Sequence, residues 1–117
     1  MSAPHIKTAI PRRRYQLGSF VASILSEVES DDPAEYRYIM ALVEDGKSEP
    51  CLYVTAELNP PQERDQGRYR LRVMLGEQSK VMGSADEWGD IEKFALDSLG
   101  ITAKLYHLMD EEPLRLM

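Results

Sequence analysis

Apolar and polar side chains alternate along residues 68–75, which is the clearest pattern in the chain. Successive side chains of a strand point to opposite faces, so this alternation predicts a strand with one face toward a core. The inward face would carry Tyr69, Leu71, Val73 and Leu75, and the outward face Arg68, Arg70, Arg72 and Met74.

Three further strands are predicted before this one. Residues 14–28 are rich in β-forming side chains and predict a long central strand, bent at Gly18 or Ser19, although a spacing of four also allows a helix over residues 20–28. Residues 35–44 and 51–58 alternate similarly, joined by a turn at Asp45-Gly46. In the last of these strands, Tyr53 and Glu57 would face outward. After residue 75, Lys80 to Gly83 predict a short edge strand.

The hydrophobic period changes after residue 84 and predicts one amphipathic helix. Trp88, Ile91, Ala95 and Leu99 recur at intervals of three and four. Ser84 and Glu87 have capping-box spacing with Asp86 as a rival cap, and Gly100 predicts the end of the helix. Residues 101–109 suit a strand or a second helix, and the alternation favours the strand.

These elements predict an α+β fold, with a meander-like antiparallel sheet of about five strands and one C-terminal helix on one face. The length of 117 residues suits one domain, which we expect over residues 14–109. Residues 1–13, with Pro4 and Pro11, predict a flexible basic arm, and residues 110–117 a polar tail.

Composition narrows the classes of function. The formal net charge is −6, which repels nucleic acid and anionic membranes at long range. Cys51 is the single cysteine and no stretch is apolar enough to span a membrane, so we expect a soluble, cytoplasmic protein. The basic residues 12–14 and the apolar run after them do not form an export signal, because polar residues interrupt the run.

The sequence predicts no catalytic residue, no metal site and no cofactor. It holds no zinc-protease motif, no phosphate-binding glycine loop and no dinucleotide fingerprint. A nucleophile and base pair of Cys51 and His107, or a cation held by Asp86, Asp90 and Asp97, is conceivable. For Cys51 the favoured interpretation is a small packed side chain. For the three aspartates it is the solvated face of the predicted helix.

The remaining candidate is a binding face made of Arg68, Arg70, Arg72 and Tyr53. The arginines could contact phosphates while Tyr53 stacks on unpaired bases. The order of elements resembles, in layout alone and without a shared motif, that of a family of single-strand DNA-binding coactivators. The favoured interpretation is a salt-bridged surface, with the arginines paired to Glu57 or Glu44.

The function that follows from these patterns is a noncatalytic protein-interaction module. The first two predicted strands are apolar on both faces, whereas one helix covers only one face of the sheet. We therefore expect a homodimer whose second subunit packs sheet against sheet, with the arginines at its rim. Another protein is also a possible partner, and single-stranded nucleic acid is the alternative that the net charge disfavours.

Overall fold

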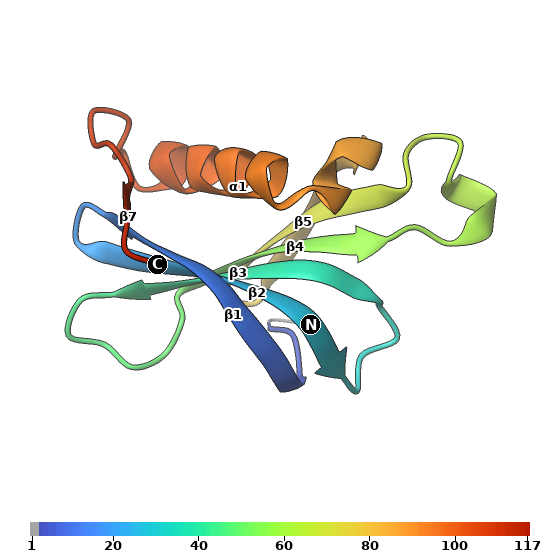
Figure 1. The fold of residues 1–117 in the computed structure, drawn as a ribbon, viewed down its shortest axis with the longest axis horizontal. Helices are drawn as coiled ribbons and strands as arrows, with labels where there is room; N and C mark the ends of the chain where they lie inside the picture. Colours follow the sequence, from blue (N-terminus) through green and yellow to red (C-terminus); the bar gives the residue numbers. More distant parts are fainter. Residues whose placement is uncertain (1–2) are drawn as a thin grey trace.

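The computed structural model describes residues 3–117, in which seven antiparallel strands form one sheet and a single α-helix lies across one face (Figure 1). The α+β class is confirmed, although the described sheet has seven strands and not about five. The strands lie in the order β6-β5-β4-β3-β2-β1-β7. Their bounds are β1 (Ile6–Leu17), β2 (Phe20–Ser30), β3 (Tyr36–Glu44), β4 (Leu52–Leu58), β5 (Tyr69–Leu75), β6 (Gln78–Ala85) and β7 (Leu114–Arg115).

A hairpin replaces the long strand expected over residues 14–28. Gly18 and Ser19 form its turn, since Leu17 pairs with Phe20, and Gly18 has the positive φ of 58° that such a tight turn requires. The sequence predicted a bend at Gly18 or Ser19, and the chain does change direction there, but it forms a hairpin turn and not a bend within one strand. The alternative helix over residues 20–28 is wrong, because these residues belong to β2.

Both ends of the described chain contribute strands. Of the expected arm, residues 1–2 lie outside the described residues, and residues 6–13 pair with β2 as the first part of β1. Pro11 is tolerated there because β7 flanks β1 only at Tyr15 and Gln16, so the chain is a sheet edge at the proline. Leu114 and Arg115 of the expected tail form β7.

Helix α1 (Ile91–Leu105) begins later and ends later than its sequence pattern suggested. Asp90 is its N-cap and accepts a hydrogen bond from the backbone N–H of Lys93, whereas Asp86 and Trp88 lie in a short 3-10 helix (Asp86–Gly89). The helix continues through the exposed Gly100, because Thr102 beyond it is fully buried. The strand expected over residues 101–109 is therefore wrong.

The main core lies between α1 and the sheet. Phe94 of α1 is fully buried and packs against Tyr38, with ring centroids 5.4 Å apart. Leu71 of β5 is 2% exposed, in keeping with its predicted inward position. Leu75, predicted to point inward as well, is 41% exposed, because the end of β5 extends past the main core. The sheet face toward α1 is the apolar face that the sequence pattern predicted. Its burial is the main contribution to the stability of the fold.

The opposite face of the sheet is also partly buried. Ile39, Thr55 and Met74 are at most 1% exposed although α1 lies on the other side. Met74 was predicted to point outward with the arginines, and it does share their face. The start of the described chain returns to this side, where Pro4 is buried and Ala3 shares a hollow with Tyr53 and Met74. This face is therefore not a bare apolar surface.

Candidate functional site

Glu57 is the centre of the arginine-bearing face. Its carboxylate is 2% exposed and accepts hydrogen bonds from Arg70 Nε at 3.1 Å and from Arg72 Nε at 2.9 Å. The Thr55 hydroxyl donates a third bond of 2.8 Å. Antiparallel pairing of β4 with β5 causes this meeting, because Glu57 lies opposite Arg70 and Thr55 opposite Arg72. One carboxylate thus partly neutralises two of the three predicted arginines.

The four predicted site residues line three hollows of the surface. Tyr53 lies opposite Met74 on the same side of the sheet as Arg70 and Arg72, and burial raises the pKa of its hydroxyl. Arg68 precedes β5, and its guanidinium lies 6.0 Å from the Tyr69 ring centroid. It lines a different hollow, which also contains Glu27, Glu35 and Arg37.

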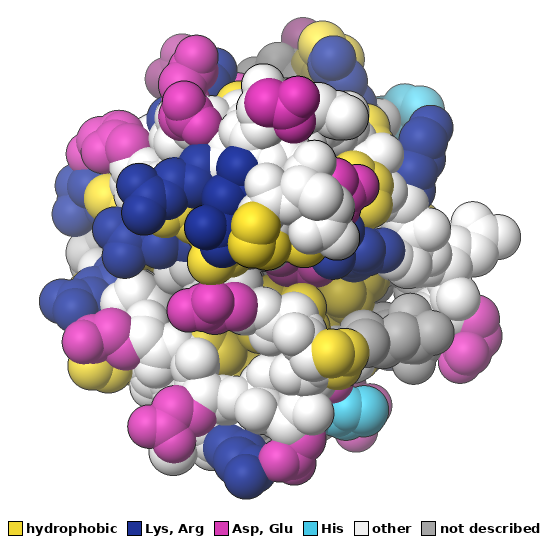
Figure 2. Space-filling model, turned by 90° about the vertical axis from the view of Figure 1, so that its right-hand side faces the viewer, with side chains coloured by type: hydrophobic (Ala, Val, Ile, Leu, Met, Phe, Trp, Pro, Cys, Tyr) yellow, Lys and Arg dark blue, Asp and Glu magenta, His cyan; other side chains and the backbone are white. Residues whose placement is uncertain are grey.

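Arg64 is a functional candidate that the sequence analysis missed. It lines a hollow of about 350 Å³ together with Arg70, Arg72 and Glu57, and we name this site the arginine hollow. The hollow lies at the end of the molecule where the β2–β3 turn and the β4–β5 connection meet, and Figure 2 shows several Lys and Arg side chains gathered on this end. Its other lining residues are Pro33, Ala34, Glu35, Leu58, Asn59 and Pro60.

The β4–β5 connection holds Arg64 in place through buried polar contacts. Asn59 is 2% exposed, and its amide donates to the Gly67 carbonyl at 2.8 Å and to the Ser84 hydroxyl at 3.0 Å. Arg64 Nε donates to the Asn59 carbonyl at 2.9 Å. Only glycine fits at position 67, where a Cβ atom would lie 2.5 Å from the backbone nitrogen of Ala85. No local sequence signal reveals this fold of the connection.

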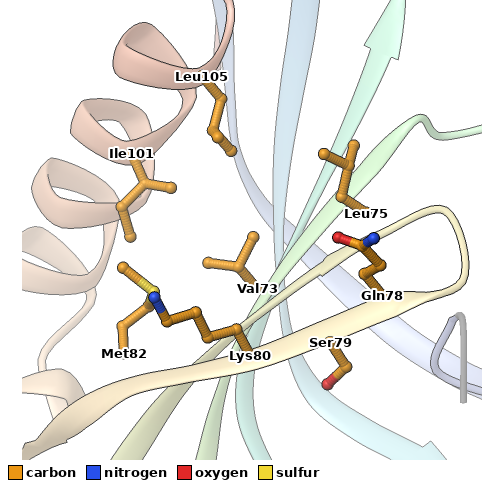
Figure 3. A pocket seen from close by; sticks show the side chains of 8 residues that line it. All are labelled: Val73, Leu75, Gln78, Ser79, Lys80, Met82, Ile101 and Leu105. Atoms are coloured by element: carbon orange, nitrogen blue, oxygen red, sulfur yellow. The ribbon is translucent and has the colours of Figure 1, made fainter.

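A second candidate site is an apolar groove of about 590 Å³ between α1 and the β5–β6 hairpin (Figure 3). Val73 lies at its centre, with Ile101 and Leu105 of α1 on one side and Met82 of β6 nearby. Exposed fractions of 50% for Met82 and 44% for Leu105 make this an open, apolar surface. We name it the α1–β6 groove, and its further lining residues are Leu75, Gln78, Ser79 and Lys80.

Strand β6 borders the α1–β6 groove and is a free edge of the described sheet. It pairs with β5 on one side and, within residues 3–117, with no strand on the other. Val81, also on this strand, is 42% exposed. An edge strand beside apolar side chains offers backbone hydrogen bonds and a hydrophobic contact to the same partner.

Within the described residues, no hydrogen bond joins Cys51 to His107. His107 is exposed, whereas Cys51 accepts a hydrogen bond of 3.5 Å from the hydroxyl of the neighbouring Tyr106. Burial, followed by this contact with Cys51, raises the pKa of Tyr106 to about 12, which keeps the hydroxyl protonated and unsuited to act as a base near neutral pH.

The acidic residues of the helical region have structural roles. Asp86 accepts the backbone N–H of Arg68 at 2.7 Å, and Asp90 caps α1. Asp97 accepts the indole N–H of Trp88 at 2.8 Å and pairs with Lys93. Among residues 3–117, no group of three or more histidine, cysteine or carboxylate side chains is arranged to hold a metal ion.

Many remaining basic side chains are paired with acids. Arg12 bonds Glu27 at 2.9 Å, and Arg13 bonds Glu92. The Glu92 carboxylate raises the pKa of Arg13, and the Arg13 guanidinium lowers the pKa of Glu92. Arg12 and Arg13 are thus paired with acids of the same chain, whereas the exposed Arg14 has no ion pair within the described residues.

Comparison of the chain with models of known protein families, with curated proteins and with solved structures finds no match. In the part of the chain that the structure describes, none of the helices has both the length and the apolar composition needed to cross a membrane. Functional inference therefore rests on the two sites described above.

Proposed function

We propose that the protein is a noncatalytic protein-interaction module that forms a homodimer through the α1–β6 groove and the free edge of β6. The observation that carries this proposal is the cluster of exposed apolar side chains around the groove, formed by Leu75, Met82 and Leu105. Exposed apolar patches of this kind are typical of protein contacts, because burying them removes apolar area from water.

A second copy of the chain satisfies both features of this surface. Twofold symmetry brings the same patch of each subunit together, so two β6 edges can pair antiparallel while their apolar side chains face one another. Lys80 lies in the groove, and its ammonium group needs solvent or an acid in the contact. The length of its side chain lets the ammonium group reach solvent at the border of the contact.

We place the contact at the groove and not on the sheet face opposite α1, where a sheet-to-sheet dimer was expected from sequence. That face already buries Ile39 and Met74 within one chain, and Glu57 partly neutralises its arginines. Single-stranded nucleic acid is less well supported for the same reason. Arg68 lines an adjoining hollow, and Arg12 and Arg13 pair with acids.

Oligomeric mass tests the proposal. Light scattering or sedimentation equilibrium at micromolar concentrations should give twice the monomer mass for the wild-type chain. Met82→Glu should shift the protein to monomer, because a dimer would bury two uncompensated carboxylates in an apolar contact.

Leu96→Glu is the matched control. Leu96 is 68% exposed on α1 and does not line the groove, so this variant adds the same charge elsewhere and should remain dimeric. Circular dichroism should show that both variants are folded. A wild-type monomer throughout the concentration range would refute the homodimer, and equal dissociation of both variants would refute the groove as its contact.

A further inference from the structure

The arginine hollow presents three guanidinium groups, each oriented by at least one hydrogen bond within the protein. Arg70 and Arg72 each direct Nε to Glu57, and Arg64 directs Nε to the Asn59 carbonyl. Arg72 also donates through Nη1 to the Ser79 hydroxyl at 2.8 Å. Within the described residues, Arg64 and Arg70 have no protein acceptor at their terminal amino groups. These groups remain able to donate to a ligand in the hollow.

The charge balance of the hollow is opposite to that of the protein. Three arginines line it against two acids, Glu57 and Glu35, while the whole chain has a formal net charge of −6. Both oxygens of Glu57 are occupied by the Arg70 and Arg72 Nε groups. The hollow is therefore a local positive site on an acidic protein, with the buried carboxylate orienting two of its cations.

Guanidinium groups held in this way suit oxyanions. The planar fork of arginine donates two parallel hydrogen bonds to phosphate or carboxylate oxygens, and a doubly charged oxyanion can use several forks at once. Side-chain exposures of 27% for Arg70 and 24% for Arg72 leave both groups accessible while limiting their freedom, which reduces the entropy lost on binding.

We propose that the arginine hollow binds a phosphate group, either as free phosphate or as the phosphate of a small monoester. The volume of about 350 Å³ accommodates more than the phosphate itself. Arg70 and Arg72 form the fixed part of the site, and Arg64 supplies the third cation from the β4–β5 connection. This site is separate from the α1–β6 groove, so the inference stands independently of the proposed dimer.

Isothermal titration of the full chain with inorganic phosphate and with glycerol phosphate tests the inference. Sodium chloride matches the ionic strength in every sample. Wild-type protein should bind phosphate saturably, and tighter binding of glycerol phosphate would identify the monoester as the preferred form. Arg64→Ala should weaken binding at least tenfold, because it removes a cation without leaving Glu57 unpaired. Arg64→Lys keeps the positive charge but loses the planar guanidinium group, so its affinity for phosphate should lie between those of wild type and Arg64→Ala.

Arg68→Ala is the matched control, since it removes an exposed arginine that lines a different hollow. It should bind phosphate as the wild-type chain does. Heat release no greater than that from chloride at matched ionic strength would overturn the proposal. If Arg64→Ala and Arg68→Ala weakened phosphate binding equally, the proposal would be overturned too. Binding would then depend on the overall positive charge of the surface and not on the arginine hollow.

Discussion

Glu57 shows how one buried carboxylate organises a face of this sheet. It is almost fully buried, and its oxygens accept bonds from two arginines and a threonine hydroxyl. Burial of such a charge is unfavourable by itself, so its partners determine whether it can be tolerated. Loss of the carboxylate would leave Arg70 and Arg72 facing each other without a counter-charge.

We expect Glu57→Gln to lower the free energy of unfolding by about 2 kcal/mol. Breaking a fully buried ion pair costs roughly 3–5 kcal/mol, but both arginines are partly exposed and water screens part of the loss. Urea denaturation measures the change. Glu63→Gln, an exposed acid in the β4–β5 connection, should change the stability by less than about 0.5 kcal/mol. Similar losses in the two variants would show that the Glu57 ion pairs contribute no special stability.

Among the secondary-structure elements, α1 continues past Gly100, where the sequence pattern predicted its end. The glycine lies inside the helix and is exposed, and a Cβ atom there would meet nothing within 4 Å. Gly100→Ala should therefore raise the free energy of unfolding by about 0.5–1 kcal/mol, because alanine loses less conformational entropy in a helix. Thermal or urea unfolding measures the gain.

Gly67→Ala is the contrasting variant. The glycine has a φ of 146°, and a Cβ atom would lie 2.5 Å from the Ala85 backbone, so alanine should cost about 2 kcal/mol or more. If Gly100→Ala destabilised the protein, the residue would be needed for more than helix continuity, and the account of α1 given above would be wrong.

Sequence patterns predicted elements well where one face is buried. The alternation of β5 located Leu71 in the core, and the helical spacing located the buried Leu99. The hairpin at Gly18 was missed because β-forming residues continue on both sides of a two-residue turn. The end of α1 was missed because burial of Thr102 outweighs the cost of a glycine inside the helix.

The candidate sites were predictable only in part, for a related reason. Glu57 was among the acids expected beside the arginines, since cross-strand pairing follows from neighbouring strands. Arg64 was not, because its position depends on Asn59 bonding across the connection to Ser84. The α1–β6 groove likewise depends on a helix extended to Leu105, which the sequence pattern did not predict.

For the whole molecule, Asp32 joins the start of the described chain to the sheet. It lies in the β2–β3 turn, accepts a 2.7 Å bond from the Tyr36 hydroxyl and a 3.0 Å bond from the His5 backbone N–H, and lies 2.9 Å from His5 Nδ1. Burial raises the pKa of Asp32, but the bonds from Tyr36 and His5 outweigh it, so the pKa is lowered overall. Burial and the Asp32 contact raise the pKa of Tyr36.

This lowered pKa predicts how the stability depends on pH. A carboxyl group whose pKa is lower in the folded state stabilises the fold above its unfolded pKa of about 3.9, and the contribution disappears as pH falls through the folded value. Asp32→Asn should therefore reduce the free energy of unfolding by about 1–2 kcal/mol at neutral pH. The difference from wild type should shrink as the pH falls through the lowered pKa of Asp32, because the carboxyl group is then protonated and, like asparagine, uncharged. Urea denaturation at neutral and at acid pH measures this change.

Asp31→Asn is the control, because Asp31 forms an exposed ion pair with Lys7 and should contribute about 0.5 kcal/mol or less to the free energy of unfolding at either pH. A difference between Asp32→Asn and wild type that stays constant from neutral to acid pH would show that the carboxylate charge does not stabilise the link between the chain start and the sheet.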